Sequence, residues 1–222
     1  MIILDMNQIS LANLMMNFHM NKSTELEEDM VRHMILNSIK SEFKEILPYK
    51  FLEVYGAEAD DIIATLCKEY KDQKTMIISG DKDFIQLQKY ENVSQYSPIL
   101  KKMVNGHNPD TYIKEHILKG DSSDGVPNVL SPDHTFVEGL RQRPLSKKKI
   151  EAWIRSETGM SDEVKRNYQR NQKLIDLDNT PEDLQKSILD TFNEAPCGDR
   201  SKILTYFIEN KLKELTDSIG DF

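Results

Sequence analysis

Two acidic segments, separated by an interval long enough for a helix, decide the fold of this chain. Residues 54–64 read VYGAEADDIIA, and residues 76–84 read MIISGDKDF. An apolar, strand-like run accompanies each cluster of acids, which are Glu58, Asp60 and Asp61 in the first segment and Asp81 and Asp83 in the second. Functional sites of open α/β sheets lie beyond the carboxyl ends of the strands. The pattern therefore predicts an α/β fold in which these carboxylates meet at one edge of a mostly parallel sheet with flanking helices.

Two further segments add acids to the same edge. Residues 1–5 read as a buried strand with Asp5 at its tip, because short runs of Ile and Leu are typical of parallel core strands. Residues 119–127 read KGDSSDGVP, which places Asp121 and Asp124 three positions apart around small residues. Each acid taken alone also fits a helix cap or a polar turn. Their recurrence at several expected strand and helix ends favours a shared site.

The chemistry of these acids indicates a divalent metal site. Carboxylates that are held close together repel one another unless cations lie between them. Oxygen ligands suit Mg²⁺, with Mn²⁺ as a substitute, and the five His residues show no zinc-ligand spacing. The acids therefore predict a site for two Mg²⁺ ions that hydrolyses phosphodiesters.

Hydrophobic periodicity predicts the remaining elements. Strands are expected at 50–54 and 75–79, and a hairpin at 92–96 and 101–104. Helices are expected at 9–18, 27–46, 60–71, 84–87, 109–118, 168–178, 181–192 and 201–215. We expect an α/β core over residues 1–108 and a helical lobe over residues 109–222.

A basic cluster follows the last acidic segment, and part of it starts a helix after Pro144 and Ser146. Its members are Arg141, Arg143, Lys147, Lys148 and Lys149. Such a cluster is typical of contacts with a nucleic-acid phosphate backbone, which give affinity without sequence readout. A solvated helix face fits the same residues.

Composition indicates a soluble protein of a reducing compartment. The 222 residues are 38% hydrophobic and 30% charged, with only two Cys, which makes a disulfide framework unexpected. No apolar run approaches the roughly 20 residues of a membrane span, and the first residues lack the features of a signal peptide. We therefore expect a cytoplasmic monomer without membrane contacts. The net charge of −8 disfavours broad nucleic-acid affinity but does not describe how the charge is distributed.

In their order, the three acidic motifs resemble those of the structure-specific 5′ nuclease family. This family includes flap endonucleases and the 5′ nuclease domains of bacterial DNA polymerases. Residues 31–40 (VRHMILNSIK) and 215–222 (LTDSIGDF) resemble its branch of ribonucleases H from T-even-like bacteriophages. The resemblance covers both ends and most of the chain. It implies a PIN-like nuclease core and, for a phage-encoded member, a location in the host cytoplasm.

The resemblance also implies a role for each acid. Asp5, Glu58 and Asp60 match the acids of the family's first, catalytic metal site. The acids of the second site are matched by Asp81, Asp83, Asp121 and Asp124. Residues 118–153 resemble the family's helix-three-turn-helix module, which grips the backbone of duplex DNA. Residues 131–149 stand here in place of the family's glycine-rich hairpin.

The implied activity is that of a Mg²⁺-dependent 5′→3′ exonuclease and flap endonuclease. Its substrates would be duplex DNA, flap DNA and RNA–DNA hybrid, and its role the removal of RNA primers in lagging-strand replication. In the phage members the C-terminal end contacts the single-stranded-DNA-binding protein, which is therefore an expected partner.

One departure from the family keeps alternatives open. The family has a further strand, which ends in a metal-binding Asp, and a helical arch at a place where this chain has no room, between about residues 44 and 50. Whether these parts are deleted or missing from the chain as printed stays open. A chain that truly lacks them suggests a nuclease-weak or inactive protein that binds branched DNA. An acidic α/β core also fits a PIN-type endoribonuclease, although the basic helical lobe weighs against it.

Overall fold

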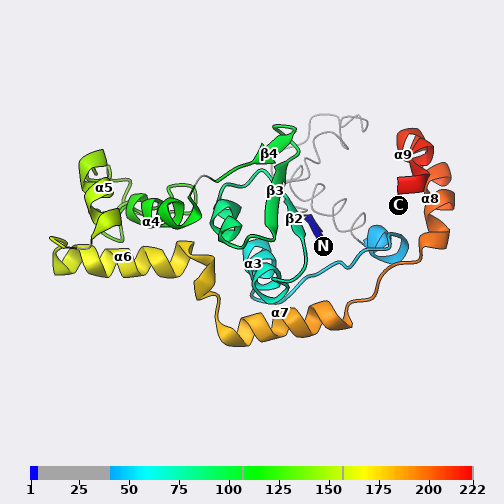
Figure 1. The fold of residues 1–222 in the computed structure, drawn as a ribbon, viewed down its shortest axis with the longest axis horizontal. Coiled ribbons are helices and arrows are strands. Elements are labelled where there is room, and N and C mark those ends of the chain that lie inside the picture. Colours follow the sequence, from blue (N-terminus) through cyan, green and yellow to red (C-terminus); the bar gives the residue numbers. More distant parts are fainter. Residues whose placement is uncertain (5–40, 107, 157, 222) are drawn as a thin grey trace. The chain divides into compact units, whose positions relative to one another are not determined.

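The computed structural model describes residues 1–4, 41–106, 108–156 and 158–221, and the chain forms two compact units (Figure 1). Among the described residues, unit 1 comprises residues 1–4 and 56–186, and unit 2 comprises residues 41–55 and 187–221. Compactness does not test the division into a nuclease core and a helical lobe after residue 108, which stays a prediction. No helix in the described parts of the chain is long and apolar enough to cross a membrane.

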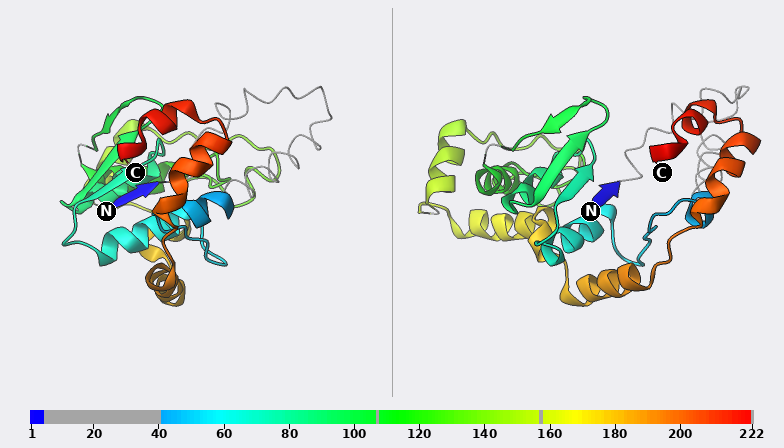
Figure 2. Two further views of the ribbon diagram at one scale, coloured as in Figure 1. Left: turned by 90° about the vertical axis from the view of Figure 1, so that its right-hand side faces the viewer. Right: turned by 45° about the vertical axis from the view of Figure 1, so that its right-hand side comes forward.

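A four-stranded sheet in the order β1-β2-β3-β4 forms the centre of unit 1 (Figures 1 and 2). Its strands are β1 (Ile2–Leu4), β2 (Thr75–Ile78), β3 (Val93–Ser97) and β4 (Lys102–Val104). The first three strands run parallel, and β4 returns antiparallel to β3. The register pairs Ile78 with Leu4 on one side and with Tyr96 on the other. The prediction of a mostly parallel sheet is confirmed, and so is the hairpin.

A buried core joins the sheet to α3 (Ala59–Glu69) and to the 3₁₀ helix η1 (Asp83–Lys89). The residues of this core are Ile63, Ala64, Cys67, Ile77, Phe84, Leu87 and Val93. Burial raises the pKa of the Cys67 thiol to about 12, so this cysteine behaves as a small apolar residue. Because the core fixes α3 and η1 against β2, it also fixes the acidic segments at their starts.

The helical part of unit 1 contains α4 (Pro109–Lys119), α5 (Lys147–Arg155), α6 (Asp162–Ile175) and η2 (Leu177–Asn179). Helices α4 and α6, drawn in green and yellow, lie side by side (Figures 1 and 2). Helix α7 (Glu182–Glu194) begins in unit 1 and ends in unit 2.

Two fully buried asparagines of α6 hold the loop that follows α4. The Asn167 side chain donates to the carbonyl of Val129 at 3.0 Å. The Asn171 side chain donates to the carbonyls of Ile117 at 2.8 Å and Pro127 at 2.9 Å. An unpaired buried polar group costs roughly 1–3 kcal/mol, so these amides specify where the loop lies.

Unit 2 contains a helix at 41–46, η3 (Arg200–Lys202), α8 (Ile203–Glu209), α9 (Lys213–Asp217) and η4 (Ile219–Asp221). Its buried core is formed by Ile46, Ile203 and Phe207. The single helix predicted over 201–215 is wrong in detail, because Lys211 adopts a φ of 57° and interrupts it.

The strand predicted at 50–54 is also wrong. Only Lys50 pairs, in an isolated antiparallel bridge with Cys197, and its ammonium group lies 4.5 Å from the centre of the Phe192 ring. A short apolar run fits a strand or a loop equally well, so periodicity alone does not decide between them. The helix predicted at 9–18 and residues 27–40 of the helix predicted at 27–46 lie outside the described residues.

Candidate metal site

Six of the seven acids predicted to bind metal line one pocket in unit 1, with a volume of about 500 Å³. These acids are Glu58, Asp60, Asp81, Asp83, Asp121 and Asp124. The rest of the lining consists of Gly80, Lys82, Tyr112, His116 and Ser123. The lining residues come from the start of α3, the turn between β2 and η1, helix α4 and the loop after it. The seventh acid, Asp5, lies outside the described residues.

The start of α3 contributes two of these acids and uses a third for its own structure. Glu58 is the N-cap residue and is exposed, and Asp60 is half-buried. Asp61 accepts a hydrogen bond from the Glu58 N–H at 3.1 Å and another from the Thr180 hydroxyl at 2.9 Å. Asp61 is therefore a capping residue, and it does not line the pocket.

The turn after β2 is held from the neighbouring strand. The Asp81 N–H donates to the Ser79 hydroxyl at 3.1 Å, and the Asp83 N–H donates to Asp81 Oδ1 at 3.0 Å. The fully buried Gln95 of β3 donates to the carbonyls of Ser79 at 3.0 Å and Asp81 at 2.5 Å. Both acids are thus fixed at the carboxyl end of β2 before any ligand binds.

A glycine makes the turn between α4 and the last acidic segment possible. Gly120 has a φ of 69°, and a Cβ atom at this position would lie 2.3 Å from the carbonyl oxygen of Val126. The Val126 N–H donates to the Asp121 carbonyl at 2.6 Å, which closes the loop. Ser123 donates to Asp121 Oδ1 through its N–H at 2.8 Å and through its hydroxyl. Asp124 is exposed at the pocket.

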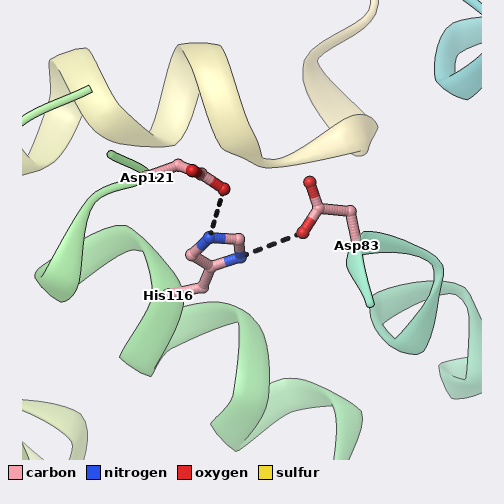
Figure 3. Close-up of side chains that lie close together, drawn as sticks. All are labelled: Asp83, His116 and Asp121. Atoms are coloured by element: carbon pink, nitrogen blue, oxygen red, sulfur yellow. Dashed lines mark hydrogen bonds and ion pairs between the residues drawn. The ribbon is translucent and has the colours of Figure 1, made fainter. Parts of the chain in front are cut away.

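The sequence analysis missed His116, which lies between two of the acids (Figure 3). Its Nε2 is 3.1 Å from Asp121 Oδ2, and its Nδ1 is 3.4 Å from Asp83 Oδ1. The rings of Tyr112 and His116 meet edge to face, with centroids 5.8 Å apart. The spacing of four between them puts both on the face of α4 that leads into the acidic loop, and this spacing is the feature that indicates them.

Negative charge accumulates in the pocket around Asp83. Burial raises the pKa of Asp83 to about 6, with further contributions from Asp81, Asp121 and Asp124 and an opposing one from His116. Burial also raises the pKa of Asp121, but hydrogen bonds from Ser123 and His116 outweigh it, so the pKa is below its ordinary value. A divalent cation would relieve this repulsion, and the donor set fits one: the ligand atoms of Asp83, His116 and Asp121 lie within 4.8 Å of one another.

The described residues that line the pocket do not pair a nucleophile with a general base. The Ser123 hydroxyl donates to Asp121 rather than to His116. Burial, together with the negative charge of Asp83, raises the pKa of Tyr112 to about 12, so its hydroxyl stays protonated near neutral pH. Among the described lining residues, the arrangement favours cation binding over covalent catalysis.

The basic cluster lies apart from the pocket lining, around the start of α5. All five of its cationic residues are exposed. Ser146 caps the helix by accepting from the Lys149 N–H at 3.4 Å. Arg143 pairs with Glu163 at 3.6 Å, and Lys147 pairs with Glu151 at 3.9 Å.

With this geometry in place, comparison with known proteins decides the family. Residues 107–222, more than half of the chain, match the family model described as T4 RNase H, C terminal. The chain belongs to the T4 ribonuclease H family. Residues 14–117 match the model of the 5′-3′ exonuclease, N-terminal resolvase-like domain. The resemblance noted from the acidic motifs is therefore confirmed.

Individual relatives of this T4 ribonuclease H family member support the same assignment. Ribonuclease H of Enterobacteria phage T4 is 34% identical over 197 residues, which are 84% of this chain. The chain covers 65% of that protein, slightly less than two thirds of its length. A 5′-3′ exonuclease of Buchnera aphidicola (subsp. Schizaphis graminum) is 38% identical over 89 residues, which are 36% of this chain and 31% of the relative.

A solved structure shows the fold. The crystal structure of the T5 D15 protein, co-crystallised with metal ions, aligns with a TM-score of 0.50 at 19% identity. The alignment covers 80% of this chain and 74% of the T5 chain. The predicted fold class, a PIN-like α/β core with a C-terminal helical lobe, is confirmed.

Charge in the pocket gives a stability prediction for Asp83→Asn in the absence of metal. Because the folded state raises the pKa of Asp83 to about 6, the folded protein binds a proton that the unfolded chain releases between about pH 4 and 6. Stability from this group is present below that window and lost as pH rises through it. At pH 8 in EDTA, the substitution should raise the free energy of unfolding by about 1–2 kcal/mol.

The measurement is urea unfolding at pH 8 and pH 3.5, with the exposed Asp72→Asn as the matched control. At pH 3.5 the gain from Asp83→Asn should disappear, and the control should change little at either pH. If Asp83→Asn lowered the free energy of unfolding equally at pH 8 and pH 3.5, the ionised Asp83 carboxylate would not be destabilising in the folded protein.

Proposed function

We propose that the chain is a divalent-metal-dependent 5′ nuclease, acting as a 5′→3′ exonuclease and flap endonuclease. Its substrates would be RNA–DNA hybrid, duplex DNA and flap DNA, whose phosphodiesters it hydrolyses. The observation that carries this proposal is the convergence of three acidic segments, separated by up to about sixty residues, in one pocket. Membership of the T4 ribonuclease H family supports the same class of reaction.

The residues that would hold two Mg²⁺ ions, or Mn²⁺ in their place, are the pocket acids. Glu58 and Asp60, with Asp5, would serve the first site. The second site would use Asp81, Asp83, Asp121 and Asp124. When bound, such ions would activate water and stabilise the charge that develops on the scissile phosphate.

Other residues of the pocket would orient the substrate. The protonated hydroxyl of Tyr112 can donate a hydrogen bond to a phosphate oxygen, and the ammonium group of Lys82 adds positive charge at the same pocket. The Asp81 N–H donates to the Ser79 hydroxyl and the Asp81 carbonyl accepts from Gln95, so that Asp81 is held in place before the substrate arrives.

The basic cluster around α5 would bind the phosphate backbone. Lysines at a helix N-terminus are unfavourable for the helix itself, because the macrodipole is already positive there, and an anion offsets this cost. The side chains of Arg141 and Lys148 make no hydrogen bond or ion pair with the residues that the structure describes. By contrast, Arg166 and Arg170 are both paired with Asp133, so they serve the fold.

The cellular role would be removal of RNA primers in lagging-strand replication, by a cytoplasmic monomer. The C-terminal segment, with α8 and α9, would contact the single-stranded-DNA-binding protein. The alternatives remain a branched-DNA-binding protein with weak or no nuclease activity and a PIN-type endoribonuclease, since both accommodate the acidic pocket.

Cleavage of a 5′-flap DNA in the presence of Mg²⁺ tests the proposal. The wild-type chain should release the flap, and EDTA should stop the reaction. Asp81→Asn should reduce the rate by at least about 100-fold, because it removes a charge at the site of cation binding, while flap-DNA affinity in EDTA stays within about twofold.

The exposed Asp72→Asn is the matched control and should cleave at the wild-type rate. A wild-type chain that binds flap DNA but does not cut with Mg²⁺ or Mn²⁺ would support the binding-protein alternative. A preference for single-stranded RNA over flap DNA would support the endoribonuclease.

Salt dependence of DNA binding tests the basic cluster. The double variant Arg141→Ala/Lys148→Ala should weaken binding to duplex DNA in EDTA for all sequences alike. The slope of log K against log[salt] should fall by about 2, since two phosphate contacts are lost. Lys71→Ala/Lys74→Ala removes the same charge from exposed positions outside the cluster and serves as the control. An unchanged slope for the first variant would exclude the cluster from the interface.

A further inference from the structure

The pocket contains one nitrogen donor among its carboxylates. We infer that His116 is a ligand of the second metal position and gives it a preference for Zn²⁺ and Co²⁺ over Mg²⁺. This inference rests on the proposed metal-dependent function and concerns the selectivity of the same site. Carboxylate oxygens suit Mg²⁺, whereas imidazole nitrogen suits the later first-row metals.

The orientation of the imidazole follows from its partner in the loop. An ionised carboxylate only accepts hydrogen bonds, so His116 Nε2, at 3.1 Å from Asp121 Oδ2, must carry the proton of that bond. Both oxygens of Asp121 are then engaged, because Ser123 donates to Oδ1 through its N–H and its hydroxyl.

The other ring nitrogen, Nδ1, lacks a hydrogen-bond partner among the described residues. It is buried, and Asp83 Oδ1 lies 3.4 Å away. In the neutral imidazole, Nδ1 carries a lone pair, and an ionised Asp83 presents a second one. Two lone pairs at this distance repel each other unless a positive species lies against both. Figure 3 shows Asp83 beside this ring nitrogen and Asp121 beside the other.

A metal ion bound by Nδ1 and Asp83 resolves this conflict. Histidines that bind metal usually donate their other ring N–H to a carboxylate, which fixes the tautomer and makes the ligand more basic. Asp121 is placed for that part, so in this assignment it acts behind His116 as a positioning residue, in place of the direct metal contact proposed for it above. The two ligand atoms, His116 Nδ1 and Asp83 Oδ1, already lie 3.4 Å apart.

The supporting helix keeps the ring in this place. Tyr112 packs edge to face against His116, and the carbonyl of His116 accepts from the Gly120 N–H at 2.8 Å at the end of α4. The fully buried Asn171 holds the last turn of α4 through the carbonyl of Ile117. The nitrogen donor is therefore preorganised, as a selective ligand needs to be.

Metal affinities of His116→Gln provide the test. We expect Zn²⁺ and Co²⁺, measured by calorimetry on the full chain, to bind at least about tenfold more weakly to the variant, while Mg²⁺ affinity changes by less than about threefold. The visible absorption of the Co²⁺-loaded chain should shift on loss of the nitrogen ligand. His134→Gln, which changes an exposed histidine of the same unit, is the matched control and should leave all three affinities unchanged.

A second measurement uses the unmodified sequence and does not depend on the variant folding. In chain labelled with ¹⁵N-histidine, added Zn²⁺ should move the Nδ1 resonance of His116 and leave that of His134 in place. Unchanged resonances, or Zn²⁺ affinities equal in wild type and His116→Gln, would overturn the inference and leave His116 as an imidazolium between two carboxylates. If Mg²⁺-dependent flap cleavage persists in that case, the proposed function stands and only the assignment of His116 fails.

Discussion

Electrostatic repulsion within one pocket is the constraint on which this structure depends. Six carboxylates share a volume of about 500 Å³, and burial, with a further contribution from the neighbouring carboxylates, raises the pKa of Asp83 to about 6. Stability alone would favour fewer charges at this place. The fold keeps them together, which is expected where a cation site has been built at the expense of the metal-free protein.

Three separate devices hold the acidic segments against that repulsion. A glutamine on β3 fixes the turn after β2, two buried asparagines on α6 fix the loop after α4, and Gly120 allows this loop to turn back on itself. The glutamine and the asparagines do so by donating hydrogen bonds to backbone carbonyls. The acids are thus positioned by backbone hydrogen bonds and not by contacts among the carboxylates themselves.

Much of this arrangement could be predicted from the sequence, because strand tips and helix starts are local patterns. The parallel strands, α3 and the hairpin follow from periodicity, and the acids at their ends follow from the rule for parallel sheets. The hydrogen bond between Asp61 and Thr180 could not be predicted, since the two residues lie 119 positions apart in the chain. His116 was missed because its spacing of four from Tyr112 points to the acids only once α4 is placed beside η1. The segment at 50–54 misled because a short apolar run fits a strand or a loop equally well, and only Lys50 forms a β-bridge.

The central claim is that the pocket exists to bind divalent cations, and a crystal grown with Mn²⁺ tests it most directly. An anomalous difference map collected on the manganese edge locates each ion independently of any assumed chemistry. The account predicts peaks inside the pocket, within bonding distance of Asp81 or Asp83 and of at least one carboxylate from another segment. A map without a peak in the pocket, together with acidic side chains that turn toward open solvent, would contradict the claim that the pocket binds divalent cations.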